Sequence, residues 1–176
     1  MAAFFDEITE KQAEFIGKQH VFFVATAHQE GRVNLSPKGL DSFRVIDPKT
    51  VAYLELTGSG NETAAHLKHD GRITFMMCSF DQKPNILRLY GTGEAHDVGT
   101  PEFEKLMQHF EPVTGQRRII VATISSTQDS CGYSVPRMEY LEDRHTLIDY
   151  CEKYSPEELA ERMREQTHSI DGLTIR

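Results

Sequence analysis

The sequence has few cysteines, no long hydrophobic run and a shortage of positive charge, and each lack excludes a class of protein. Three cysteines among 176 residues lie far apart, so neither a disulfide framework nor a zinc knuckle is indicated. Lysine and arginine number 19 against 27 acidic residues, a formal net charge of −8. A chain this acidic lacks the electrostatic footprint of a general nucleic-acid binder. No apolar stretch approaches the roughly 20 residues that span a bilayer, so we expect no membrane insertion.

The first residues and the cysteine usage predict a cytoplasmic protein. Residues 1–7 lack both the basic segment and the longer apolar stretch of a secretory signal. An odd number of scattered thiols fits a reducing compartment. With 39% hydrophobic and 26% charged residues, the composition is typical of one globular domain.

The hydrophobic pattern predicts a mainly β protein with flanking helices. A T-x-x-Q capping box at Thr9 begins an N-terminal helix, and an S-x-x-E box at Ser155 begins a closing one. Helices are also expected at 61–69 and 100–109. The β-forming runs are 21–26, 33–36, 51–56, 73–78, 86–93 and 119–124. Six strands with few helices between them favour a closed or split antiparallel barrel over a doubly wound sheet.

The most informative local pattern is a glycine-rich turn between a strand and a helix, T-G-S-G-N-E-T at residues 57–63. Small residues at a helix N-terminus let backbone N–H groups approach an anion, which favours a phosphate site. Ser59, Asn61 and Thr63 add side-chain donors, although Asn61 is also a candidate helix cap. Glu62 would repel an anion unless it points away. The alternative is a turn that merely connects two elements.

Other ligand motifs fit the sequence less well. A dinucleotide fingerprint needs a glycine where Thr63 stands, although Asp81 follows at about the required 20 residues. A P-loop needs a Gly-Lys-Ser/Thr ending, which is absent. His66 and His69 lie three residues apart, but no third ligand accompanies them, and we predict no metal site.

A polar strand face supplies the second candidate site. Asn34, Ser36 and Lys38 alternate along one predicted strand and therefore share a face. They either contact a ligand or belong to a solvated edge strand that ends at Pro37. Arg88 stands among apolar residues of another strand and needs either water or an anionic partner.

Taken together, four segments resemble the pyridoxamine 5′-phosphate oxidase-like family of FMN-binding split barrels. They are V-N-L-S-P-K-G, Y-L-E-L-T-G-S-G-N-E-T-A-A-H-L, G-R-I-T-F-M-M and R-L-Y-G-T-G-E, in matching order and spacing from about Phe22 to His96. The later C-G-Y-S-V-P-R is similar to a poorly characterised branch rather than to the oxidase proper. The resemblance implies a six-stranded split barrel that binds FMN over residues 1–150, with a C-terminal helix and tail, 151–176, packed on the same domain. It also implies a homodimer with two FMN molecules in clefts between the subunits.

The resemblance also assigns residues to the cofactor. Lys38 matches a family lysine near the flavin, and Thr57 matches a threonine that follows the third strand. Residues 61–63 match the Ser-Arg-Lys triplet whose cations hold the FMN phosphate in the oxidase, so both cations are replaced here. The loop, Lys38 or an arginine (Arg88, Arg117 or Arg118) would have to compensate. The residues expected to bind FMN are Asn34, Ser36, Lys38, Thr57, Gly58, Ser59, Gly60, Asn61, Thr63 and Arg88.

The function implied by the resemblance is a flavin-dependent oxidoreductase acting on an unknown small molecule, with no acid or base assigned. The oxidase ends with a Trp- and Arg-containing motif that covers the flavin, whereas this chain has no Trp and ends G-L-T-I-R. Efficient oxidation of pyridoxamine 5′-phosphate is therefore not expected. The alternative is a non-catalytic protein that stores or senses flavin in the same cleft, or haem, for which the eight histidines offer ligands.

Overall fold

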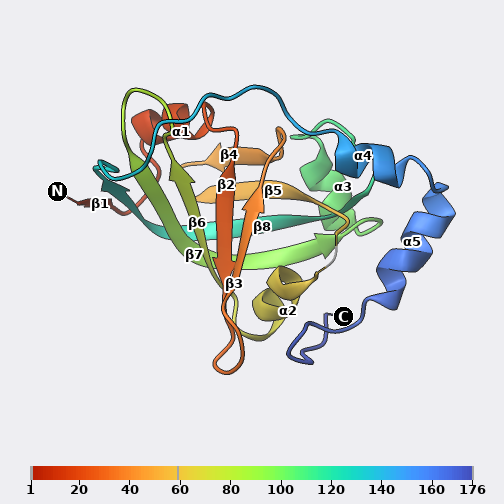
Figure 1. The fold of residues 1–176 in the computed structure, drawn as a ribbon. Coiled ribbons are helices and arrows are strands. Elements are labelled where there is room, and N and C mark those ends of the chain that lie inside the picture. Colours follow the sequence, from red (N-terminus) through yellow and green to blue (C-terminus); the bar gives the residue numbers. More distant parts are fainter. Residues whose placement is uncertain (1, 59, 176) are drawn as a thin grey trace.

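One antiparallel sheet forms the body of the protein in a computed structural model, which describes all residues except 1, 59 and 176 (Figure 1). The strand order is β3-β2-β6-β7-β8-β5-β4, with β1 paired to β8. The strands are β1 Ala3–Phe5, β2 Phe22–Thr26, β3 Asn34–Lys38, β4 Phe43–Asp47, β5 Thr50–Leu56, β6 Arg72–Cys78, β7 Ile86–Asp97 and β8 Gln116–Ser130. The helices are α1 Glu10–Ile16, α2 Glu62–His69, α3 Pro101–Met107, α4 Thr146–Cys151 and α5 Pro156–Glu165.

The predicted class, a mainly β antiparallel split barrel with flanking helices, is confirmed, but the predicted number of six strands is wrong. The described part of the chain forms eight. The two missed strands, β1 and β4, are short and pair with one neighbour each, β8 and β5. Strand pairing supplies their hydrogen bonds, and a local sequence pattern does not contain the partner. Helix α4 was also missed; it is only six residues long, and its N-cap residue, His145, makes no side-chain capping bond.

The long strands β7 and β8 hold the barrel together. They are antiparallel along almost their whole length, with a register shift between Tyr90 and Gly91. A Cβ atom at Gly91 would collide with the backbone carbonyl of Thr123, so the two strands approach closely only because this residue is glycine. The main core lies inside the curved sheet and includes Val24, Phe75, Leu87, Leu89 and Ile120.

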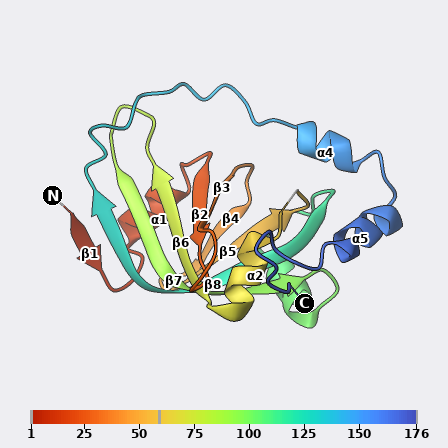
Figure 2. The ribbon, with the colours of Figure 1, turned by 60° about the horizontal axis from the view of Figure 1, so that its bottom comes forward.

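The capping boxes that the sequence predicts at the N-termini of α1 and α5 are both present. In α1, Thr9 Oγ1 accepts from the Gln12 backbone, and the Gln12 side chain accepts from the Thr9 backbone. In α5, Ser155 and Glu158 make the same reciprocal pair. Between β8 and α4 the chain follows a long arc without helix or strand, and the last residues return to lie beside α2 (Figures 1 and 2).

None of the helices among residues 2–58 and 60–175 combines the length and the apolar character that crossing a membrane would require.

Candidate functional site

A cavity of about 1330 Å³ lies between β3, β5 and the glycine-rich loop. Its inner wall contains most of the residues that the sequence analysis singled out. They are Asn34, Ser36, Lys38, Thr57, Gly58, Gly60 and Thr63. The outer wall comes from three other segments: residues 18–21 before β2, residues 80–81 after β6, and residues 138–147 in the arc after β8 and the start of α4.

The polar face of β3 points into this cavity. Strand β3 lies at the end of the sheet and pairs only with β2 among the described strands. Asn34, Ser36 and Lys38 point inward, whereas the intervening Leu35 is 63% exposed. The edge position that the sequence suggested is therefore correct, but the polar side chains face the cavity and the apolar one faces outward.

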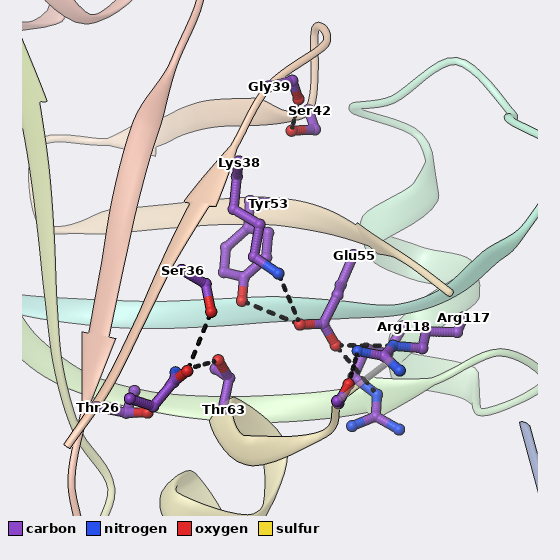
Figure 3. Close-up of polar contacts among 12 residues, drawn as sticks. Thr26, Ser36, Lys38, Gly39, Ser42, Tyr53, Glu55, Thr63, Arg117 and Arg118 are labelled. Carbon is purple, nitrogen blue, oxygen red and sulfur yellow. Dashed lines mark hydrogen bonds and ion pairs between the residues drawn. The ribbon is translucent and has the colours of Figure 1, made fainter. Parts of the chain in front are cut away.

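Hydrogen bonds fix the orientation of these side chains (Figure 3). Ser36 Oγ donates to Asn34 Oδ1 at 3.0 Å. The Asn34 amide nitrogen donates to Thr26 Oγ1 and to Thr63 Oγ1, at 3.1 Å each. The chain of bonds ends at the buried His66, whose Nδ1 lies 3.0 Å from Thr26 Oγ1. Ser36 uses its one hydroxyl hydrogen in the bond to Asn34. Its oxygen is therefore available to accept a hydrogen bond from a ligand.

A buried carboxylate, Glu55, is the electrostatic centre of the cavity wall. Lys38 Nζ and Tyr53 OH each lie 3.4 Å from Glu55 Oε1. Dashed lines in Figure 3 mark both contacts. Arg117 Nε donates to Glu55 Oε2 at 3.1 Å. Burial alone would raise the pKa of Glu55, but the charges of Arg117, Lys38 and Arg118 outweigh burial and hold the pKa below its ordinary value. Glu55 is therefore ionised at neutral pH.

The negative charge of Glu55 also affects two neighbouring side chains, Tyr53 and Arg118. Burial, followed by the negative charge of Glu55, raises the pKa of Tyr53 well above its ordinary value, so the phenol stays protonated and donates. Arg118 Nε lies 3.7 Å from Glu55 Oε2 and 2.9 Å from Asp97 Oδ1. Three cations, including Lys38 and Arg117, thus face two carboxylates, and one positive charge is left in excess.

Arg117 connects this charge cluster to the glycine-rich loop. Its Nη2 donates to the Gly60 carbonyl at 2.7 Å, and its side chain lines the cavity. Beside Gly58 the cavity is open, since a Cβ atom there would meet nothing within 4 Å. An anion at this end of the cavity would meet small backbone groups and a guanidinium, which is the chemistry that phosphate sites use.

Two residues of the loop have other partners. Asn61 occupies the N-cap position of α2 but makes no capping bond, so the expected cap is wrong; its amide instead donates to Gln166 Oε1 at 2.6 Å. Asn61 is buried and does not line the cavity. Both carboxylate oxygens of Glu62 accept from the Ile170 backbone N–H, each at 3.1 Å. The C-terminal segment therefore holds the Glu62 carboxylate in place, but Glu62 keeps its charge and also lines the cavity.

One further predicted residue, Arg88, is not brought to the cavity. Arg88 lies on β7 with Nη1 3.4 Å from Ser130 Oγ, and it does not line the cavity. Ser59 lies outside the described residues. The two histidines that were considered as metal ligands, His66 and His69, have different partners. His66 contacts Thr26, whereas His69 contacts Thr174 in the C-terminal segment.

The sequence analysis missed several residues of the site. Tyr53 and Glu55 stand two apart on β5 and so share a face, and this polar pair in an otherwise apolar strand was an available signal. No local signal marked the arc after β8 as part of the wall. There Tyr140 stacks on His20, with ring centroids 3.6 Å apart, and the Met138 backbone N–H donates to Phe80 O.

A family model described as pyridoxamine 5′-phosphate oxidase matches residues 8–131. The chain belongs to this family. A pyridoxamine 5′-phosphate oxidase family protein of Aspergillus flavus, ustO, is 38% identical over 151 residues, which cover 83% of this chain and 61% of that protein. The chain thus spans about three fifths of the length of this relative.

Solved structures show the same fold. A variant of HupZ from Group A Streptococcus aligns with a TM-score of 0.56 at 24% identity, covering 70% of this chain and 99% of that one. The FAD binding protein from Mycobacterium smegmatis aligns with a TM-score of 0.50 at 12% identity, covering 72% and 97%. In this member of the pyridoxamine 5′-phosphate oxidase family, the cavity-lining residues 138–147 follow the part that matches the family model.

Proposed function

We propose that the cavity binds FMN and that the protein is a flavin-dependent oxidoreductase acting on a small molecule. The observation that carries this proposal is the cavity itself, in which a glycine-rich loop backed by Arg117 adjoins a strand face of fixed hydrogen-bonding groups. Its volume of about 1330 Å³ exceeds the ~300–1,000 Å³ typical of single-ligand pockets, which leaves room for a second small molecule beside a cofactor.

The residues present fit an FMN molecule in charge and in shape. A phosphate is suited to the open space at Gly58 and to the guanidinium of Arg117, which lines the same cavity. The polar edge of the ring system is suited to Ser36 as an acceptor and Lys38 as a donor, and Leu54 with other apolar lining residues suits its faces. When bound, FMN would supply hydride or electron transfer, and the protein would supply position and electrostatics.

We propose that the residues contacting FMN are Asn34, Ser36, Lys38, Thr57, Gly58, Gly60 and Thr63, with Arg117 in place of the two cations missing from the family triplet. Lys38 brings an ammonium group to the wall, held 3.4 Å from Glu55. Arg117 orients the loop through Gly60 while its charge faces the cavity. The stacked His20 and Tyr140 form part of the outer wall of the cavity.

We further propose a cytoplasmic homodimer. Phe23 of β2 and Met76 of β6 are register partners on the face of the sheet opposite the core residues Val24 and Phe75. Both are only half-buried, so the described part of the chain does not fully cover them. An apolar sheet face that is left partly open supports association between two copies.

A visible spectrum with a ligand titration tests the proposal. Apo-protein is titrated with FMN and with riboflavin, which differ only in the phosphate. We expect FMN to bind at least tenfold more tightly, because a charge-assisted contact to phosphate contributes about 1.5–3 kcal/mol. Equal affinities would overturn the phosphate site. Flavin bands that bleach with a nicotinamide donor support the oxidoreductase, and flavin bands that do not respond support a storage or sensing protein. A Soret band would mean that the bound cofactor is haem rather than flavin.

A further inference from the structure

A second cavity, of about 690 Å³, lies between α5 and the chain segments that join β7 to β8. Figure 2 shows α5 beside the green connection through α3. Residues 97–98 and 112–118 form one wall, and Tyr154, Pro156, Leu159, Ala160, Met163 and Arg164 form the other. The volume falls within the range of ~300–1,000 Å³ that holds small ligands.

A buried arginine on the sheet side of this cavity has two side-chain nitrogens without a hydrogen-bond partner among the described residues. Arg118 is only 3% exposed and lines the cavity. Its Nε lies close enough to Asp97 and Glu55 for ion pairing, but neither Nε nor Nη1 makes a hydrogen bond within the described part of the chain. Buried donors without hydrogen-bond partners cost free energy, but Nε and Nη1 are both covered from solvent, so an acceptor in the cavity would bond to them only after a shift of the Arg118 side chain.

The charged groups around Arg118 also favour an anionic ligand in this cavity. Burial lowers the pKa of Arg118, and repulsion by Arg117 adds to the effect, so the attraction of Glu55 and Asp97 does not fully compensate. Arg117 and Arg164 line the same cavity, and Asp97 is its one carboxylate among the described lining residues. Arg117 and Arg118 already pair with Glu55 and Asp97, so Arg164 is the lining cation that adds positive charge beyond that cluster, and it favours a negatively charged occupant.

The rest of the lining is apolar. Val98, Val113, Leu159 and Met163 surround the space next to the arginines, with the ring of Tyr154 at one side. Inorganic anions alone gain nothing from such surfaces. A ligand with an anionic head and a short apolar body would satisfy both parts.

We propose that this second cavity is a binding site for a small amphiphilic anion, whose head pairs with Arg118 and Arg164 and whose body lies against the apolar side of α5. The site is separate from the FMN cavity, since the lining residues of the two share only Arg117 among those described.

Calorimetric titration of the full chain with sodium hexanoate tests this proposal, with inorganic phosphate as the purely ionic probe. We expect one saturable hexanoate site per chain and weaker binding of phosphate. Arg164→Gln should weaken hexanoate at least about threefold, because one charge contact at a partly exposed head is lost. The matched control is Arg162→Gln on the same helix, which removes the same charge; Arg162 lies over the Tyr154 ring and does not line the cavity. It should change the affinity less than twofold.

Two more variants test whether hexanoate occupies this cavity rather than the first one or the protein surface. Ala160→Leu places extra side-chain volume in the cavity and should weaken hexanoate at least tenfold while the protein remains folded by circular dichroism. Lys18→Ala, in the outer wall of the first cavity and outside the Glu55 cluster, should leave hexanoate binding unchanged. The proposal is overturned if wild-type protein shows no saturable hexanoate binding, if Arg162→Gln and Arg164→Gln weaken it equally, or if Lys18→Ala abolishes it.

Discussion

At the scale of single residues, Glu55 decides the stability of the site. It is buried with Lys38, Arg117 and Arg118 around it, and its removal would leave these cations facing one another without the central carboxylate. We expect Glu55→Gln to lower the free energy of unfolding by about 3–5 kcal/mol, the cost of breaking a buried ion pair from one side. Urea unfolding at pH 7 measures this. The exposed Glu14→Gln, which loses only a surface pair with Lys18, should cost less than about 1 kcal/mol.

The same carboxylate predicts a pH dependence. The pKa of Glu55 in the folded state lies below its ordinary value of 4.5, so its contribution to stability is present above pH 4.5 and is lost as the pH falls toward the folded-state value. The difference in unfolding free energy between wild type and Glu55→Gln should therefore shrink as the pH falls below 4.5. A difference that stays constant over this range would show that the charge of Glu55 does not contribute.

Lys38 is the residue that the proposed cofactor depends on most directly. Lys38→Ala should weaken FMN binding at least tenfold or shift the flavin potential, since a cation is lost from the wall of the cavity. Lys68→Ala, an exposed lysine on α2, should do neither. Wild-type affinity, spectrum and potential in the Lys38 variant would place the flavin elsewhere.

At the scale of elements, substitutions at two glycines should affect different properties: Gly91→Ala the stability of the fold, and Gly58→Ala the binding of FMN. Gly91→Ala would drive a methyl group into the Thr123 carbonyl at the contact of β7 and β8, so we expect a loss of several kcal/mol in unfolding free energy or no folded protein. Gly58→Ala meets no atom within 4 Å and should leave stability within about 0.5 kcal/mol of wild type. Because that methyl group would stand at the phosphate end of the cavity, it should weaken FMN more than riboflavin. Thermal unfolding and flavin titration of both variants check these outcomes.

The elements also show what could be predicted from the sequence. Thr9 and Ser155 begin helices as expected because a capping box is complete within four residues. The strand face of Asn34, Ser36 and Lys38 follows from alternation alone. Glu55 with its cations could not be found in this way, because Lys38 and Arg117 reach it from strands far apart in the sequence. The same holds for Glu62, whose partner Ile170 is 108 residues away.

At the scale of the whole molecule, association should depend on the outer sheet face. Phe22 and Met77 are buried, at 5% and 1% exposure, whereas Phe23 and Met76 are half-buried and Leu35 is exposed, so these last three residues are available to a partner. We expect light scattering at micromolar concentration to give a dimer, and Met76→Glu to shift it toward monomer. A wild-type monomer that binds FMN would contradict a cleft formed between subunits.

The last prediction concerns the substrate from which the family takes its name. Among the described residues, the cations lining the first cavity are Lys18, Lys38, Arg117 and Arg144, and two of them already pair with Glu55. The outer wall adds several carboxylates, among them Asp81, Glu139, Glu142 and Asp143. A substrate phosphate would compete with the FMN phosphate for the same positive charge.

Pyridoxamine and pyridoxine 5′-phosphate should consequently be poor substrates. Losing each charge-assisted contact to a phosphate costs on the order of 1.5–3 kcal/mol, and losing two depresses the rate by about two to four orders of magnitude. The measurement is the oxygen-dependent appearance of pyridoxal 5′-phosphate with FMN-loaded protein. Turnover near one per second or faster, within the usual enzyme range, would mean that residues of the outer wall such as Lys18 and Arg144 form a phosphate cradle despite the carboxylates beside them.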